Sequence, residues 1–285
     1  MKLAFLGTGL MGSPMVCRLL KAQQEVTVWN RSAEKARALA AHGARVADSS
    51  IDAVRGAQAV ITMLINGEAV ESVLMPDALL ETISPGAMVI DMSSIAPTQA
   101  KEHAVRLRKR GIRYLDAPVS GGTLGAESGT LAIMAGGDEI DVQWASPILS
   151  AMGHVTHVGP SGSGQLVKLA NQMIVGMTIG AVAEALLLVE RGGGSSIKAI
   201  EAMQGGFASS RILEVHGTRM AQRDFKKRAA MRVQLKDMNN ALTTAESLDL
   251  PITSLVADMY LSAISHGNGD LDHSALWLEL ERRNR

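Results

Sequence analysis

The run KLAFLGTGLMG, residues 2–12, places a short apolar segment directly before three glycines spaced as G-x-G-x-x-G. Its first half is typical of a strand, and apolar residues recur at helical spacing over residues 14–22. In such a strand–turn–helix unit, Gly7 permits the tight turn, Gly9 lets the backbone approach a pyrophosphate and Gly12 lets the helix pack closely on the strand. The run therefore predicts a dinucleotide site formed by Gly7, Thr8, Gly9, Leu10, Met11 and Gly12.

Short β-rich segments alternate with helical ones through the first half of the chain, which is the pattern of a parallel sheet with crossover helices. The expected strands cover residues 2–6, 25–29, 59–63, 88–91, 113–116, 130–135 and 154–158. The expected helices cover residues 14–22, 33–42, 98–110 and 139–152. This alternation predicts an α/β dinucleotide-binding domain over residues 1–161.

The alternation stops after GPSGSG, residues 159–164, and helical spacing continues from there to the C-terminus. A long helix is expected from about Gln165 to Arg191. Shorter helices are expected at residues 196–203, 212–221, 233–248, 254–265 and 274–283. The second half therefore predicts an all-α domain over residues 162–285, built on the long helix.

The composition excludes several classes of protein. The 285 residues carry 28 Lys and Arg against 28 Asp and Glu and are 47% hydrophobic, so the chain is neither disordered nor basic enough for a nucleic-acid or anionic-membrane partner. The N-terminal apolar run ends at Gly7 without a cleavage site, so we expect no export signal and a cytoplasmic protein. The longest apolar stretch, residues 174–189, contains Glu184 and predicts a buried helix rather than a membrane span.

The end of the second expected strand indicates which cofactor is bound. A site for NAD commonly has Asp or Glu there, which binds the ribose 2′-hydroxyl, whereas this chain has Asn30 followed by Arg31. A neutral amide and a guanidinium suit a 2′-phosphate. We therefore expect NADP(H) to be preferred over NAD(H); the alternative is that Arg31 is only an exposed residue of the first helical turn.

Three further motifs follow along the chain: DAPVSGG at residues 116–122, G-x-G-x-x-x-K-x-x-N at residues 162–171, and the pair Lys236-Asp237. Together with the G-x-G-x-M-G form of residues 7–12, they closely resemble the β-hydroxyacid dehydrogenases. This family contains 3-hydroxyisobutyrate dehydrogenase, tartronate semialdehyde reductase and the glyoxylate/succinic semialdehyde reductases. The resemblance covers essentially the whole chain and implies a Rossmann domain followed by an all-α domain.

The resemblance also assigns roles to residues. The family's catalytic lysine corresponds to Lys168 and its neighbouring asparagine to Asn171, and the i, i+3 spacing places both on one face of a helix. The segment that holds the substrate carboxylate corresponds to Ser120, Gly121 and Gly122, and Lys236 corresponds to a lysine near the nicotinamide and substrate. Further cofactor contacts correspond to Asn30, Arg31, Ser32, Met63, Leu64, Ile65 and Ser94.

The expected activity is reduction of small carboxylate-bearing aldehydes or ketones, of the tartronate semialdehyde, succinic semialdehyde or glyoxylate type, to hydroxyacids. Hydride would come from NADPH, and Lys168 would act as general acid and base. The alternatives are a 3-hydroxyisobutyrate dehydrogenase, an imine reductase, a class whose members usually lack the lysine, and a non-catalytic NADP-binding protein. Side chains around Phe207, Ala208, Ser209 and Trp277 are expected to select the substrate.

No metal site is expected. His154 and His157 have H-x-x-H spacing, but residues i and i+3 of a strand face opposite ways. The apolar face of the helix at residues 165–191 needs more cover than a small helical domain usually supplies. We therefore expect a homodimer or a homotetramer.

Overall fold

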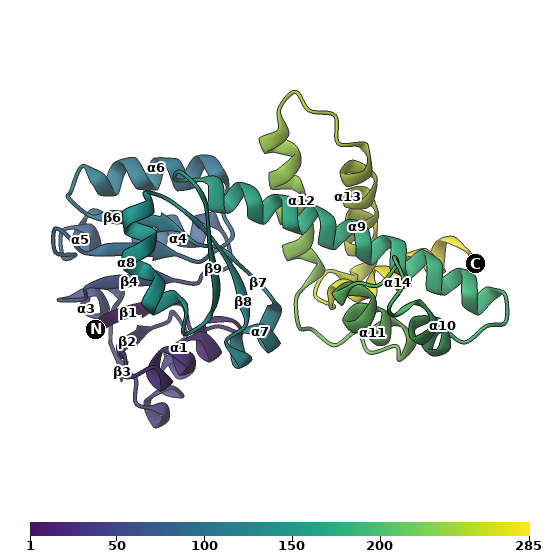
Figure 1. The fold of residues 1–285 in the computed structure, drawn as a ribbon, viewed down its shortest axis with the longest axis horizontal. Coiled ribbons are helices and arrows are strands. Elements are labelled where there is room, and N and C mark those ends of the chain that lie inside the picture. The colour runs from purple at the N-terminus through teal and green to yellow at the C-terminus, as the bar shows by residue number, and fades with distance from the viewer. The chain divides into compact units, whose positions relative to one another are not determined.

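The computed structural model describes residues 1–285 and divides into two compact units. The first unit runs from Met1 to Lys168 and the second from Leu169 to Arg285. In Figure 1 the first unit is coloured purple to teal and the second green to yellow.

The first unit is built on one sheet whose strands run in the order β3-β2-β1-β4-β5-β6-β8-β7, with β9 beside β8. The strands from β3 to β6 in this order pair in parallel, and β8 runs antiparallel to β6 and β7. The predicted parallel sheet is confirmed. Its strands are β1 Lys2–Leu6, β2 Glu25–Trp29, β3 Arg45–Val46, β4 Ala59–Thr62, β5 Met88–Asp91, β6 Arg113–Asp116, β7 Val119–Ser120, β8 Leu131–Gly136 and β9 Gly153–Gly159.

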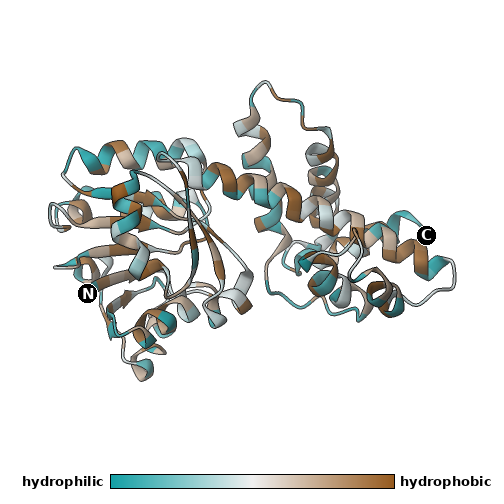
Figure 2. Cartoon of the chain, viewed as in Figure 1, coloured by the Kyte–Doolittle hydropathy of each residue, from teal (hydrophilic) through white to brown (hydrophobic).

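Helices cover both faces of this sheet, because successive strand residues point to opposite sides. In β1, Leu3 and Phe5 join the core under α1, α2, α7 and α8, whereas Ala4 and Leu6 join the core under α3 to α6. Figure 2 shows hydrophobic residues gathered in the strands between these layers. The helices are α1 Gly12–Lys21, α2 Ala33–Arg37, η1 Ala40–His42, α3 Ser50–Val54, α4 Gly67–Leu74, α5 Asp77–Leu80, α6 Pro97–Arg108, α7 Gly122–Ser128 and α8 Glu139–Leu149.

Six short elements of this unit are absent from the expectations drawn from the sequence. They are β3, α3, α4, α5, β7 and α7, and each spans eight residues or fewer. A helix or strand this short shows too little periodicity to be recognised, so its conformation is decided by packing on the sheet. The segment expected as one helix over residues 33–42 is instead α2 followed by the short 3-10 helix η1.

The second unit is all helical, as predicted. Most of the long helix α9, Ser163–Arg191, belongs to it, and Ile179 and Leu186 on α9 pack in one core with Tyr260 and Trp277. Trp277 is completely buried, so it lines no substrate pocket, and the expectation that it helps to select the substrate is wrong. The other helices are α10 Ser196–Met203, η2 Leu213–Gly217, α11 Thr218–Ala221, α12 Met231–Ala245, α13 Pro251–Ala263, η3 Ile264–Asn268, η4 His273–Ala275 and α14 Leu276–Arg283.

By length and composition, α9 is the one helix that could cross a membrane. α9 has 29 residues, so it extends beyond the apolar stretch noted in the sequence at residues 174–189. Core helices of soluble proteins meet the same criterion. Here 44% of the most apolar window of α9 is buried within the protein, and α9 contributes directly to the core of the second unit.

A buried carboxylate fixes the start of α12 in the second unit. Asp272 accepts hydrogen bonds from Arg219 Nη1 at 3.1 Å, Ser274 Oγ at 2.7 Å and the Ala229 amide at 3.3 Å. Burial raises the pKa of Asp272, but hydrogen bonds with His216 and Ser274 and the charge of Arg219 outweigh burial and hold that pKa below its usual range. The next residue, His273, hydrogen-bonds the Ala230 carbonyl through Nε2 at 3.1 Å. Residues 229 and 230 are therefore anchored immediately before α12 begins.

Candidate functional site at the carboxyl ends of the strands

The three glycines of the loop after β1 have two different roles: two allow close packing, and one leaves open space for a ligand. Gly7 has φ +104°, and a Cβ there would overlap the Met63 carbonyl oxygen and lie 2.8 Å from Leu64 Cδ2. A Cβ on Gly12 would overlap the Gly7 carbonyl oxygen. Gly9 differs, because a Cβ there would meet no atom of the protein within 4 Å. Packing therefore requires Gly7 and Gly12, whereas Gly9 leaves open space in front of the N-terminus of α1, which fits a pyrophosphate approaching the backbone.

At the end of β2, Asn30 makes structural hydrogen bonds, whereas Arg31 is exposed. Asn30 Oδ1 accepts a hydrogen bond from the Thr8 amide at 3.0 Å, and Asn30 Nδ2 donates to the Ser32 carbonyl at 3.0 Å. Asn30 thus connects the strand end to the glycine loop, a structural task that the sequence did not indicate. Arg31 is exposed and forms no ion pair. Its guanidinium is an exposed positive charge at this strand end.

Ser93, which the sequence analysis did not single out, joins three segments at the same edge. Its Oγ accepts a hydrogen bond from the Leu64 amide at 2.9 Å, and its amide donates to Asp91 Oδ1 at 3.0 Å. Its carbonyl accepts from Gln165 Nε2 at 2.8 Å. Ser93 thereby holds the loop with Met63, Leu64 and Ile65 beside the loop that carries Ser94.

A buried carboxylate at the end of β6 holds the beginning of α9. Asp116 is fully buried and accepts hydrogen bonds from the Gly162 amide at Oδ1, 2.7 Å away, and from the Gln165 amide at Oδ2, 2.9 Å away. Burial raises the pKa of Asp116 to about 7, the two amide bonds work against that rise, and the charge of Asp91 adds to it. Gln165 adds a second attachment, because its Oε1 accepts from the Ile95 amide at 3.1 Å.

The Ser120–Gly122 segment lies where β7 passes into α7. Gly121 has φ +136° and Gly122 has φ +62°, conformations that side chains other than glycine rarely adopt. Both glycines are exposed, and a Cβ on Gly122 would meet nothing within 4 Å. Ser120 is half-buried. The segment therefore presents accessible backbone of the kind that can bind a small anion.

Lys168 and Asn171 lie one turn apart on α9. Lys168 is 8% exposed, whereas the adjacent apolar residues Leu166 and Val167 are 53% and 37% exposed. Lys168 and the next residue, Leu169, which is 2% exposed, are therefore turned inward on α9. A buried ammonium one turn from an amide can act on a single carbonyl oxygen.

A chain of amides orients Asn171 within the second unit. Asn171 Nδ2 donates to Gln172 Oε1 at 2.9 Å, and Gln172 Nε2 donates to Gln234 Oε1 on α12 at 3.0 Å. Gln234 Nε2 returns a hydrogen bond to the Gln172 carbonyl at 2.8 Å. Lys236 lies on α12 two residues further on and pairs with Asp237 at 2.9 Å. Gln172 and Gln234 were not predicted to contribute, because their pairing joins positions 62 residues apart.

The predicted residues therefore fall into two sets. The first unit contains the glycine loop, the ends of β2, β4 and β5, the Ser120–Gly122 segment and Lys168, and the second unit contains Asn171 and Lys236. Because the carboxyl ends of parallel strands lie at one edge of a sheet, the residues of the first unit that were predicted to contact the cofactor lie along that edge.

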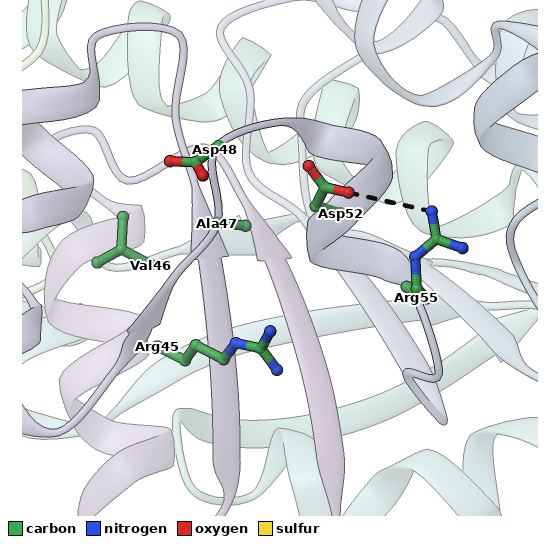
Figure 3. Close-up of a pocket in the computed structure, with 6 residues that line it drawn as sticks. All are labelled: Arg45, Val46, Ala47, Asp48, Asp52 and Arg55. Atoms are coloured by element: carbon green, nitrogen blue, oxygen red, sulfur yellow. Dashed lines mark ion pairs between the residues drawn. The ribbon is translucent and has the colours of Figure 1, made fainter.

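Figure 3 shows a pocket beside β3 and α3, distinct from the predicted site residues. It has a volume of about 240 Å³ and includes none of the predicted site residues. Its carboxylates and guanidinium groups have opposite charges, and Asp52 pairs with Arg55 at 4.0 Å. The lining residues are Arg45, Val46, Ala47, Asp48, Asp52 and Arg55.

Comparison with known proteins identifies the family of both units. Residues 2–159 match the NAD binding domain of 6-phosphogluconate dehydrogenase, and residues 162–279 match the NAD-binding domain of NADP-dependent 3-hydroxyisobutyrate dehydrogenase. The chain is 40% identical to 2-hydroxy-3-oxopropionate reductase of Escherichia coli, over 99% of this chain and 97% of that protein. It is 35% identical to an NAD-dependent L-serine dehydrogenase of Pseudomonas aeruginosa, over 96% of each chain.

A solved structure of a related enzyme has the same fold. The 3-hydroxyisobutyrate dehydrogenase of Mycobacterium tuberculosis, solved with L-serine, superposes with a TM-score of 0.88 at 34% identity, over 98% of each chain. Its likeness extends through both units, and the relatives above are named as dehydrogenases or reductases that act on hydroxyl or carbonyl groups. The chain therefore belongs to the β-hydroxyacid dehydrogenase family of NAD(P)-dependent oxidoreductases.

Proposed function

We propose that this dehydrogenase reduces a small carboxylate-bearing aldehyde or ketone, of the 2-hydroxy-3-oxopropionate (tartronate semialdehyde) type, with NADPH, and that Lys168 supplies the proton. The observation that carries the proposal is the buried position of Lys168 one turn before Asn171 on α9. The choice of substrate class rests on the 40% identity to 2-hydroxy-3-oxopropionate reductase. Succinic semialdehyde and glyoxylate belong to the same chemical class.

The proposed roles follow from the chemistry of each group. A bound nicotinamide dinucleotide supplies hydride to the carbonyl carbon. Lys168 gives a proton to the alkoxide that develops on the carbonyl oxygen, and takes it back in the oxidative direction. The amide of Asn171 has a second N–H beyond the one that it donates to Gln172, and this N–H can bind the same oxygen.

Binding groups surround this reaction centre in the proposal. Ser120 and the backbone at Gly121 and Gly122 hold the substrate carboxylate, and Lys236 lies near nicotinamide and substrate. The cofactor is held by residues 7–12, by the loops with Met63, Leu64, Ile65 and Ser94, and by the end of β2 with Asn30, Arg31 and Ser32. The open space at Gly9 supports the placement of the pyrophosphate.

A second candidate is oxidation of a β-hydroxyacid such as 3-hydroxyisobutyrate or L-serine. Two relatives favour it, the 3-hydroxyisobutyrate dehydrogenase solved with L-serine and the L-serine dehydrogenase. The same lysine would then act as the base. Rates with each acid aldehyde and NADPH, compared with rates for each hydroxyacid and NADP⁺ or NAD⁺, separate the two candidates.

Substitution of Gly9 tests the cofactor loop. Gly9→Ala should leave the melting temperature nearly unchanged, because its Cβ meets nothing in the protein. It should weaken NADPH binding by about 1–3 kcal/mol, the usual cost of an extra methyl group in a filled space. Gly12→Ala should instead lower the melting temperature, because its Cβ overlaps the Gly7 carbonyl oxygen. Thermal melts and NADPH fluorescence titration measure both effects, and unchanged affinity in Gly9→Ala would contradict the placement.

Lys168→Ala tests the proton donor. We expect kcat to fall by about 10²- to 10⁴-fold, the range that a positioned acid contributes, with the Kd for NADPH unchanged. Lys198→Ala removes a lysine on α10 that pairs with Glu201 on the surface, and should keep wild-type turnover. Absorbance decay of NADPH with the acid aldehydes gives kcat and KM. Wild-type turnover in Lys168→Ala would refute the assignment.

Arg31→Ala tests the cofactor preference. Loss of a charge-assisted contact to the 2′-phosphate, worth about 1.5–3 kcal/mol, should raise the KM for NADPH by about 10- to 100-fold and leave the KM for NADH nearly unchanged. Arg37→Ala on α2 removes another exposed arginine and should change neither value. A wild-type enzyme that prefers NADH would contradict the proposed preference at once.

We also propose that the exposed face of α9 joins copies of this chain. Ala170, Ile174, Ala181 and Leu188 are exposed and fall along one side of the helix at 3.6-residue periodicity. Light scattering should give a mass that is a multiple of 30.1 kDa. Ile174→Glu should lower that mass, whereas Ile140→Glu, on an even more exposed isoleucine of α8, should not. A monomeric wild type would rule out the interface.

A further inference from the structure

We propose that Asp116 is a positioning residue for the reaction: its carboxylate holds the first turn of α9 and thereby places Lys168 at the carboxyl edge of the sheet. The inference rests on the proposed function, since it takes Lys168 as the proton donor. It assigns a task to the aspartate that opens the DAPVSGG motif and to the two glycines of the G-x-G-x-x-x-K motif.

The contact differs from ordinary helix capping, because the cap comes from a distant strand. Each carboxylate oxygen of Asp116 accepts one backbone N–H, from Gly162 at 2.7 Å and from Gln165 at 2.9 Å. Amides at the start of a helix have no partner inside the helix, so these two bonds satisfy them and fix the helix end to β6. Asp116 lies 46 and 49 residues before its two partners.

Glycines allow the helix end to come this close. A Cβ on Gly164 would lie 2.8 Å from Asp116 Oδ2 and would overlap the Met134 carbonyl oxygen. A Cβ on Gly136 of β8 would lie 2.7 Å from Asp116 Oδ1 and 2.6 Å from the Gly164 amide nitrogen. The carboxylate is therefore enclosed on both sides with no space for adjustment, so the position of the helix end is tightly defined.

The attachment of the first turn of α9 also sets the position of Lys168. Gln165, whose amide bonds to Asp116, also bonds through its side chain to Ser93 and Ile95 at 2.8 and 3.1 Å. Lys168 lies three residues later, on the same helix face and about 4.5 Å further along the axis. Helical side chains lean toward the N-terminus, so the lysine is directed back over the anchored turn. A displacement of about 1 Å at such a group can cost 10²-fold in rate.

The protonation state of Asp116 determines the strength of the same two hydrogen bonds. A carboxylate accepts both N–H groups, whereas the hydroxyl oxygen of a protonated carboxyl is a poor acceptor and leaves one N–H without its bond. The pKa of Asp116 is raised to about 7, first by burial. As pH falls through 7, the attachment should weaken and kcat should fall. The titratable groups that interact with Asp116 are Asp91 on β5 and Tyr114 on β6. His103 on α6 acts on Asp91, and the side chain of Lys101 on α6 lies beside Gly162.

Asp116→Asn tests the proposal, because it keeps one acceptor oxygen and replaces the other with a donor. In the full-length enzyme with NADPH and the best acid aldehyde, we expect kcat at pH 8 to fall by about 10- to 100-fold. The Kd for NADPH should stay within about twofold, and the decrease of kcat below pH 7 should disappear. Hydrogen exchange of the peptide covering residues 160–168 should become faster.

Asp141→Asn is the matched control. Asp141 is another buried carboxylate of the first unit, on α8, where it pairs with Arg113 at 3.3 Å. This variant should keep the wild-type kcat, pH profile and exchange. If Asp116→Asn does not fold, Gln165→Met replaces it, because it removes the second attachment and leaves the carboxylate; its kcat should fall while the pH dependence stays.

The double variant Lys168→Ala/Asp116→Asn separates this inference from the proposed function. If Asp116 acts through Lys168, the double variant is no slower than Lys168→Ala alone. An Asp116→Asn enzyme with wild-type kcat and pH profile, or one whose loss persists unchanged in the Lys168→Ala background, overturns the positioning role and leaves the proposed function intact. Wild-type turnover in Lys168→Ala overturns both.

Discussion

The candidate site of this enzyme depends on a geometric constraint: parallel strands end at one edge of their sheet. β1, β2, β4, β5 and β6 run in parallel, so the segments that follow them all leave at the same side. The glycine loop, Asn30, Ser93 and Asp116 are adjacent for that reason alone. Their hydrogen bonds then connect one loop to the next, from the Thr8 amide to Asn30 and from the Leu64 amide to Ser93.

The second requirement is that segments of the chain approach one another closely, and several glycines permit this. Gly7 and Gly12 let the turn after β1 fold against its own backbone, and Gly136 and Gly164 let a strand and a helix end enclose a carboxylate. Gly9 and Gly122 have free space in front of them instead. Similar sequence motifs thus contain two kinds of glycine, one required for packing and one that keeps backbone accessible.

The carboxylate of Asp116 attaches the start of α9 to the end of β6. Buried carboxylates are costly unless hydrogen-bonded, and Asp116 satisfies both oxygens with helix amides that would otherwise lack partners. In the second unit, Asp272 does the corresponding work before α12, with Arg219 and Ser274 as partners. In both units a buried acid therefore fixes the start of the helix that carries a lysine of the family motifs.

The sequence by itself determined the class of fold, the order of the long elements and the family, because hydrophobic periodicity and short motifs are local properties. The strands at residues 2–6, 25–29, 88–91 and 113–116 could be predicted with their bounds. Tertiary structure alone decided the short helices and the partners of Asp116, Ser93, Gln165 and Gln234. It also buried Trp277, which the sequence had placed in a pocket. These features join positions tens of residues apart, so they depend on how the chain packs and leave no local pattern in the sequence.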